Sequence, residues 1–196
     1  MDWRSLTRTT APVLDPVTSS EVYRHLRLVE DDTEKAYADA VADVAREYVE
    51  QNTGTALLTQ TWEVRYDEWW DGVLELPYPP LQSVSSIKYI DNNGTEQTLS
   101  ASQYQVQTGE PIGFVQWAAN ATIPVARAEA GAVRIVFVAG YTSASLVPSS
   151  LKQAMLLLLA QWFENREPTQ SPFSAFPAEV PFTVTALLNQ YRSRWL

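Results

Sequence analysis

Residues 74–94 read LELPYPPLQSVSSIKYIDNNG, and this stretch is the most informative about the fold. It predicts two short strands on either side of a stiff elbow, followed by a hairpin turn. The three prolines within 77–80 fix φ and cannot donate to a ladder, so the elbow must lie outside the interior of a sheet. Asn93-Gly94 tolerates the positive φ angles of a tight hairpin. We therefore expect antiparallel sheet around this stretch.

From Thr55 to about Ala144, apolar residues tend to recur at every second position. Trp62, Val64 and Tyr66 alternate with polar residues, and Val133–Val138 is a denser apolar run. Such patterns are typical of strands with one buried face or two. They predict an antiparallel β region of about five to seven strands.

Helical patterns flank the β region on both sides. Thr18 followed by Glu21 is a capping box that opens a short helix through about Leu28. A longer helix, capped by Asp31 or Asp32, should end at Gly54. Its predicted apolar stripe consists of Tyr37, Val41, Val44 and Tyr48. After the β region, residues 148–166 form a helix that is apolar almost all round, which indicates a central or shared position.

These patterns predict an α+β protein. We expect a helical bundle made of residues 18–54 and 148–166, with residues 55–147 inserted as antiparallel sheet. Residues 1–17 and 167–196 should be extended terminal arms, because prolines punctuate both. The second arm should end in a short amphipathic helix.

Charge and composition exclude several classes of function. Fourteen Lys and Arg against 23 Asp and Glu give a formal charge of −9, which repels the phosphate backbone of DNA. The chain has no cysteine, so disulfides and thiolate metal sites are excluded. The longest apolar run, Ala154–Ala160, is far too short to span a bilayer.

The sequence offers no recognisable catalytic constellation. His25 is the only histidine, and no glycine-rich elbow surrounds a serine. We therefore expect no enzyme, no cofactor and no metal. The one alternative is a monomeric sugar-binding module that uses Trp69 and Trp70 as a stacking platform beside acidic residues. Adjacent acids at a strand end point to opposite sides, which favours a structural role for this segment.

An ordered set of local motifs carries a family resemblance. The set comprises the helix end Tyr48–Gly54, then Leu76–Leu81, Ser83–Gly94, Val138–Tyr141 and Trp162–Arg166. In this order the chain resembles head–tail connector (adaptor) proteins of long-tailed bacteriophages, prophages and gene-transfer particles. The motifs do not separate an infectious phage from a gene-transfer particle.

The resemblance implies a mechanical function in the virion. Connectors assemble in the bacterial host cytoplasm as rings of about twelve subunits on the portal protein. The ring extends the DNA channel, which DNA passes without specific binding, and joins capsid to tail through the next connector or a tail-terminator protein. The family has no catalytic residues.

Three sets of residues are predicted to serve this assembly. For the ring interface we expect Leu156, Leu157, Trp69 and Trp70, because surplus aromatic and apolar side chains gather at interfaces. For the channel lining we expect the acids Asp39, Asp43 and Glu47. For portal binding we expect apolar anchors in the C-terminal arm, namely Phe173, Phe176, Phe182, Leu187, Leu188, Tyr191 and Trp195.

Overall fold

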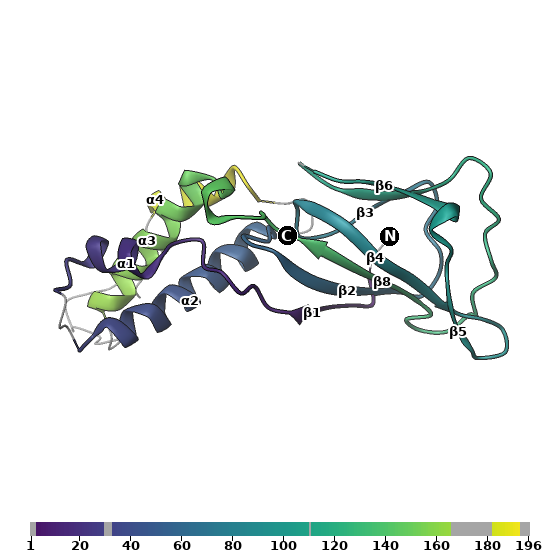
Figure 1. Ribbon diagram of the computed structural model, residues 1–196, viewed down its shortest axis with the longest axis horizontal. Coiled ribbons are helices and arrows are strands. Elements are labelled where there is room, and N and C mark those ends of the chain that lie inside the picture. Colours follow the sequence, from purple (N-terminus) through teal and green to yellow (C-terminus); the bar gives the residue numbers. More distant parts are fainter. Residues whose placement is uncertain (1–2, 30–32, 110, 166–181, 193–196) are drawn as a thin grey trace. The chain divides into compact units, whose positions relative to one another are not determined.

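The chain folds into two compact units (Figure 1). This computed structural model describes residues 3–29, 33–109, 111–165 and 182–192. The β unit combines Met1–Val13 with Leu58–Thr142, and the helical unit combines Leu14–Leu57 with Ser143–Leu196. Helices and antiparallel sheets thus segregate into separate units, which confirms the predicted α+β class.

The helices of the helical unit are α1 (Ser19–Leu26), α2 (Lys35–Thr53), α3 (Ser149–Glu164) and α4 (Phe182–Asn189). The predicted capping box is confirmed, because the Thr18 N–H donates to Glu21 Oε2 at 2.7 Å and the Glu21 N–H donates to Thr18 Oγ1 at 3.3 Å. Gly54 ends α2 in the left-handed conformation, with φ 63°. The capping box and the glycine C-cap are both local sequence signals, and both lie at the positions that the sequence predicts.

The core of the helical unit uses smaller residues than the predicted stripe. On α2 the buried row is Ala38, Val41, Ala45 and Val49, whereas Val44 is 55% exposed. Alanines allow α2 to approach α3 closely, and α3 buries Leu151, Ala154, Met155, Leu158 and Leu159. The larger Tyr37 and Tyr48 contact the rings of Phe163 and Trp162 on α3, each at 5.6 Å between centroids.

The β unit contains a five-stranded antiparallel sheet in the order β1, β2, β8, β4, β5. The strands are β1 (Ser5–Thr10), β2 (Gln60–Tyr66), β8 (Val133–Ala139), β4 (Leu81–Ile90) and β5 (Glu96–Thr98). The sequence predicts an extended arm over residues 1–17, but Ser5–Thr10 pairs with β2 as an edge strand. The serine and threonine residues of β1 give little hydrophobic alternation, so the sequence pattern does not predict this strand. The pairing joins residues that are far apart in sequence, such as Ser5 and Arg65.

A second sheet of three strands runs in the order β3, β7, β6. Its strands are β3 (Val73–Glu75), β7 (Phe114–Trp117) and β6 (Tyr104–Gln107), and two 3-10 turns, η1 (Ala101–Gln103) and η2 (Ala144–Leu146), complete the described elements.

The five-stranded sheet has one buried face, on which Trp62, Val64 and Tyr66 of β2 pair with Phe137, Ile135 and Val133 of β8. The intervening residues of both strands are only partly covered.

The elbow and the hairpin that the sequence predicts are both present. Residues 76–80 lie between β3 and β4 and belong to neither strand. The Asp91 Oδ1 atom accepts the N–H groups of Asn93 and Thr95, each at 2.9 Å, and Gly94 has φ 79°. The carboxylate therefore holds the turn that leads into β5.

Within the described ranges, no helix has the length and apolar character needed to cross a membrane.

Candidate assembly surfaces

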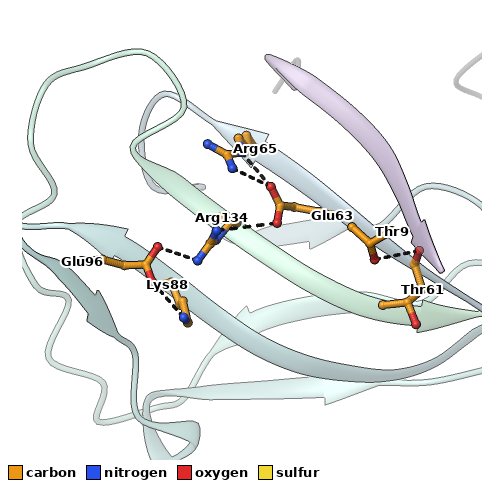
Figure 2. A network of polar contacts seen from close by, with 7 residues as sticks. All are labelled: Thr9, Thr61, Glu63, Arg65, Lys88, Glu96 and Arg134. Atoms are coloured by element: carbon orange, nitrogen blue, oxygen red, sulfur yellow. Dashed lines mark hydrogen bonds and ion pairs between the residues drawn. The ribbon is translucent and has the colours of Figure 1, made fainter.

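An ion network crosses four strands on the partly covered face of the five-stranded sheet (Figure 2). Glu63 on β2 contacts Arg65 at 2.7 Å and Arg134 on β8 at 3.7 Å. Arg134 also contacts Glu96 on β5, which Lys88 on β4 contacts at 2.8 Å. The edge strand β5 has only three residues, and the ion pairs of Glu96 connect it to β4 and β8.

The contacts with Lys88 and Arg134 lower the pKa of Glu96 and so make its contribution to stability depend on pH. The hydrogen bond from Lys88 is the largest cause that lowers the pKa of Glu96, and the positive charge of Arg134 adds to it. A carboxyl group whose pKa is lower in the folded state stabilises the fold above its unfolded pKa, which is about 4.3 for Glu. That contribution is lost as the pH falls through the folded-state pKa.

We therefore expect Glu96→Gln to lower the thermal midpoint of unfolding at pH 7, and we expect this effect to shrink as the pH falls through the lowered folded-state pKa of Glu96. The measurement is the difference in midpoint between parent and variant at each pH. Glu68→Gln is the control, since Glu68 is exposed and forms no ion pair with the residues described in the structure. A difference between parent and variant that stays constant as the pH is lowered would contradict this explanation.

The two tryptophans predicted as an interface or a sugar platform lie in an aromatic cluster of the β unit. Trp70 is 4% exposed and stacks on Trp117, with ring centroids 4.5 Å apart and an interplanar angle of 9°. Trp69 contacts Trp117 and Tyr89, and its Nε1 donates to the Pro124 carbonyl at 2.8 Å. Trp70 therefore presents no surface to another chain, and the two rings form no flat platform for a sugar.

The predicted ring residues on α3 are half-buried. Leu156 and Leu157 are partly covered, and Leu158 and Leu159 are buried in the helical unit. Packing within the chain thus accounts for most of the apolar character of α3. Leu156 and Leu157 are still partly exposed, so their role in the ring interface remains a prediction.

Asp39 and Asp43, which the sequence assigns to the channel lining, contact other side chains of the helical unit. Asp39 accepts a hydrogen bond from the Tyr23 hydroxyl at 2.6 Å. Asp43 lies 3.2 Å from Arg46, which also contacts Asp15 at 2.7 Å. Asp15, Asp39, Asp43 and Arg46 line a pocket of about 200 Å³, to which Val22 of α1 and Met155 of α3 also contribute. Spacing on α2 identified the acids but gave no signal for Tyr23 or Asp15, which reach α2 only in the folded chain.

The C-terminal residues divide into buried and exposed positions. Val184 and Leu188 of α4 are buried against the helical unit, and the Tyr191 hydroxyl lies 2.9 Å from Ser150 Oγ. Leu188 is therefore a core residue and no portal anchor, contrary to the prediction. Phe182 is 87% exposed and Leu187 is half-buried. Phe173, Phe176 and Trp195 lie outside the described residues.

The described residues contain no group of three or more His, Cys, Asp or Glu that could hold a metal ion. Their surfaces instead combine charged side chains with isolated apolar ones. The most exposed large apolar residues include Val13, Phe182, Val29, Val125, Leu14, Leu146 and Val44.

Comparison with known proteins relates the whole chain to one kind of particle. No protein-family model matches the sequence, and no curated protein matches it. A chain in the neck of an empty gene transfer agent (GTA) particle, computed with C6 symmetry, matches with a TM-score of 0.77 and 27% identity. The match covers 96% of this chain and 95% of that one. This structural neighbour belongs to a gene transfer agent particle.

Two further structures give the same result. A chain in the virion of the native GTA particle matches with a TM-score of 0.76 and 27% identity. A chain in the neck of the native GTA particle, computed with C12 symmetry, matches with a TM-score of 0.70 and 25% identity. Each match covers 96% of this chain and 95% of the matched GTA chain, so both units are included.

Proposed function

We propose that this chain is a structural connector in the neck of a phage-like gene-transfer particle. In this proposal, copies of the chain form a ring on the portal protein, extend the DNA channel, and join the capsid to the next connector or tail protein. The observation that carries the proposal is the match to GTA neck chains over 96% of this chain. The C6 and C12 symmetries of those neck structures support a cyclic ring, which heterologous contacts can close.

The charge of the chain suits such a role. A formal charge of −9 gives no electrostatic attraction for duplex DNA, so DNA can pass the ring without being retained by it. The buried Trp70 and the hydrogen-bonded Trp69 remove the main support for a sugar-binding module.

Deletion of the chain from a particle-producing strain tests the proposal. We expect DNA-filled capsids that carry portal but no tail, and we expect expression of the intact chain in trans to restore complete particles. Particles with normal tails in the absence of the chain would overturn the proposal. Empty capsids alone would indicate a role in packaging and would also contradict it.

Portal binding by the C-terminal region remains part of the proposal, with a smaller set of residues. Phe182 is the described candidate, because burying an aromatic side chain that is 87% exposed would favour contact with a partner. Phe173, Phe176 and Trp195 stay candidates from the sequence. Truncation after Arg166 is a poor test, because it also removes the buried Val184 and Leu188.

A pair of point substitutions separates docking from folding. We expect Phe182→Ser to change the free energy of unfolding by less than about 0.5 kcal/mol, since the side chain is exposed. The same variant should lose most of its co-purification with portal. We expect Leu188→Ala to destabilise the chain by about 2–4 kcal/mol, because it leaves a cavity in the core. Unchanged portal binding by the folded Phe182→Ser variant would contradict the docking role of Phe182.

A further inference from the structure

Strand β1 lies at the edge of the five-stranded sheet, where β2 is its neighbour (Figure 1). The structure describes all six residues of β1, and none of them is buried. The Thr9 hydroxyl donates to the Thr61 carbonyl at 3.2 Å. Arg4, just before the strand, donates to the Asp67 carboxylate, with Nε 3.1 Å from Oδ1. Both contacts are exposed, so β1 can leave the sheet without taking a buried side chain out of the core.

The segment that follows β1 has the features of a hinge. Residues 11–17 read APVLDPV and contain no helix or strand. The boundary between the β unit and the helical unit falls within this segment, between Val13 and Leu14. Its two prolines restrict φ, and each disfavours the helical conformation of the residue before it, so the segment prefers an extended path to a tight turn.

The hinge also exposes apolar surface. The Val13 side chain is 94% exposed and that of Leu14 is 58% exposed, whereas Val17, three residues further on, is buried. Two adjacent apolar side chains therefore meet water at the point where the chain passes from one unit to the other. Covering them would be favourable, at about 25 cal/mol for each Å² of apolar surface removed from water.

We infer that β1 is exchanged between copies of this chain in the ring, so that β1 of one copy pairs with β2 of the next. An exchanged β1 makes the same ladder with β2 that it makes within one chain. The two arrangements therefore differ chiefly in the hinge. Exchange brings a second copy beside Val13 and Leu14, because they follow the docked strand by three and four residues, and it covers what a single chain leaves exposed.

Strand exchange is compatible with a closed ring. The strand that is given and the strand that receives it are different parts of the chain, so each copy gives β1 to one neighbour and accepts β1 from the other. Neighbours in a ring are held together, which gives the exchanged strand a high effective concentration. This inference rests on the proposed ring and adds the contact that joins its copies.

Engineered cysteines distinguish exchange from pairing within one chain, because the parent chain has no cysteine. Ser5 on β1 lies opposite Arg65 on β2. Opposed residues of an antiparallel pair have Cα atoms about 4.5–5.5 Å apart, which a disulfide can bridge. A Ser5→Cys, Arg65→Cys double variant is assembled into particles under reducing conditions and then oxidised with copper(II). Each pair of thiols gives two electrons to copper and two protons to water, and one S–S bond forms.

We expect the oxidised particles to give a ladder of covalent multimers on non-reducing gels, because each disulfide joins two copies. The same variant, oxidised as a free chain before assembly, should form the disulfide within one chain and keep the mass of a monomer. This control shows that the two cysteines meet. Particles that then yield only the disulfide within one chain, or none, would overturn the inference and leave the proposed function intact.

A second pair of positions keeps the test valid if the first variant does not fold or its free chain does not form the disulfide. Thr7 lies opposite Glu63, and the Thr7→Cys, Glu63→Cys variant is treated in the same way, with a short bismaleimide as an alternative to oxidation. Folding of each variant is checked by its thermal midpoint under reducing conditions. Absence of the parent chain from the neck would reject the ring itself, and the inference with it.

Discussion

Gly140→Ala should destabilise the β unit strongly for a change that adds a single methyl group, by about 3–5 kcal/mol. A Cβ atom at Gly140 would lie 2.1 Å from the carbonyl oxygen of Leu58, and backbone cannot move aside as a flexible side chain can. The residue also has φ 107°, which a side chain rarely adopts. Its N–H donates to the Pro80 carbonyl at 2.8 Å, so any shift also disturbs the elbow.

Gly109→Ala is the matched control for this change. Gly109 has the same φ of 107°, but a Cβ atom there would have no heavy atom within 4 Å. We expect it to cost about 1–2 kcal/mol from the backbone conformation alone. Chemical denaturation of both variants measures the difference, and equal destabilisation would show that the close approach to Leu58 has no effect.

Trp70→Ala should have a comparably large effect, a loss of about 3–5 kcal/mol. The substitution removes an almost completely buried indole and ends its stacking on Trp117. It also removes the edge contact with Trp69, whose centroid lies 5.7 Å away. The free energy of unfolding from urea denaturation is the measurement. A loss below about 1 kcal/mol would indicate that the ring is available to a ligand or to another chain.

Trp70→Phe refines this test. The Trp70 Nε1 group is buried and has no hydrogen-bond partner among the described residues. Phenylalanine keeps a ring against Trp117 and removes the unsatisfied donor, so part of the lost packing is offset. We expect a loss of about 1–2 kcal/mol for Trp70→Phe, clearly below the value for alanine. A loss as large as that of alanine would contradict the role given to stacking.

Local chemistry made parts of this fold predictable. The capping box at Thr18 and the left-handed end at Gly54 involve residues within four positions, so the sequence alone specifies them. The Asn93-Gly94 hairpin and the alternation in β2 are equally local. Seven strands lie between Gln60 and Ala139 in the described chain, within the range of five to seven that periodicity predicts.

Long-range packing was not predictable in the same way. The edge strand β1 needs β2, about 60 residues away, before its serine and threonine pattern acquires a buried side. On α2 the row of alanines matters because α3 lies close, and a hydrophobic scale gives alanine little weight. The surplus of tryptophans predicts an interface, but the rings of Trp69, Trp70 and Trp117 pack against one another inside the β unit.

The candidate assembly residues show the same division. Periodicity located the acids of α2 and the apolar face of α4, but it could not show that Tyr23 and Arg46 engage Asp39 and Asp43. Nor could it show that Leu188 is buried while Phe182 remains exposed. Exposure is a property of the folded unit, so the docking residues could be reduced to a testable set only with the structure.

Electron microscopy of purified particles is the decisive measurement for the proposed ring. A reconstruction of the region between capsid and tail, from particles in which this chain carries a small fused marker, would locate every copy. The proposed function predicts one closed ring of the chain in the neck, in contact with the portal and surrounding the DNA channel. Marker density elsewhere in the particle, or a neck without a ring of this chain, would contradict it.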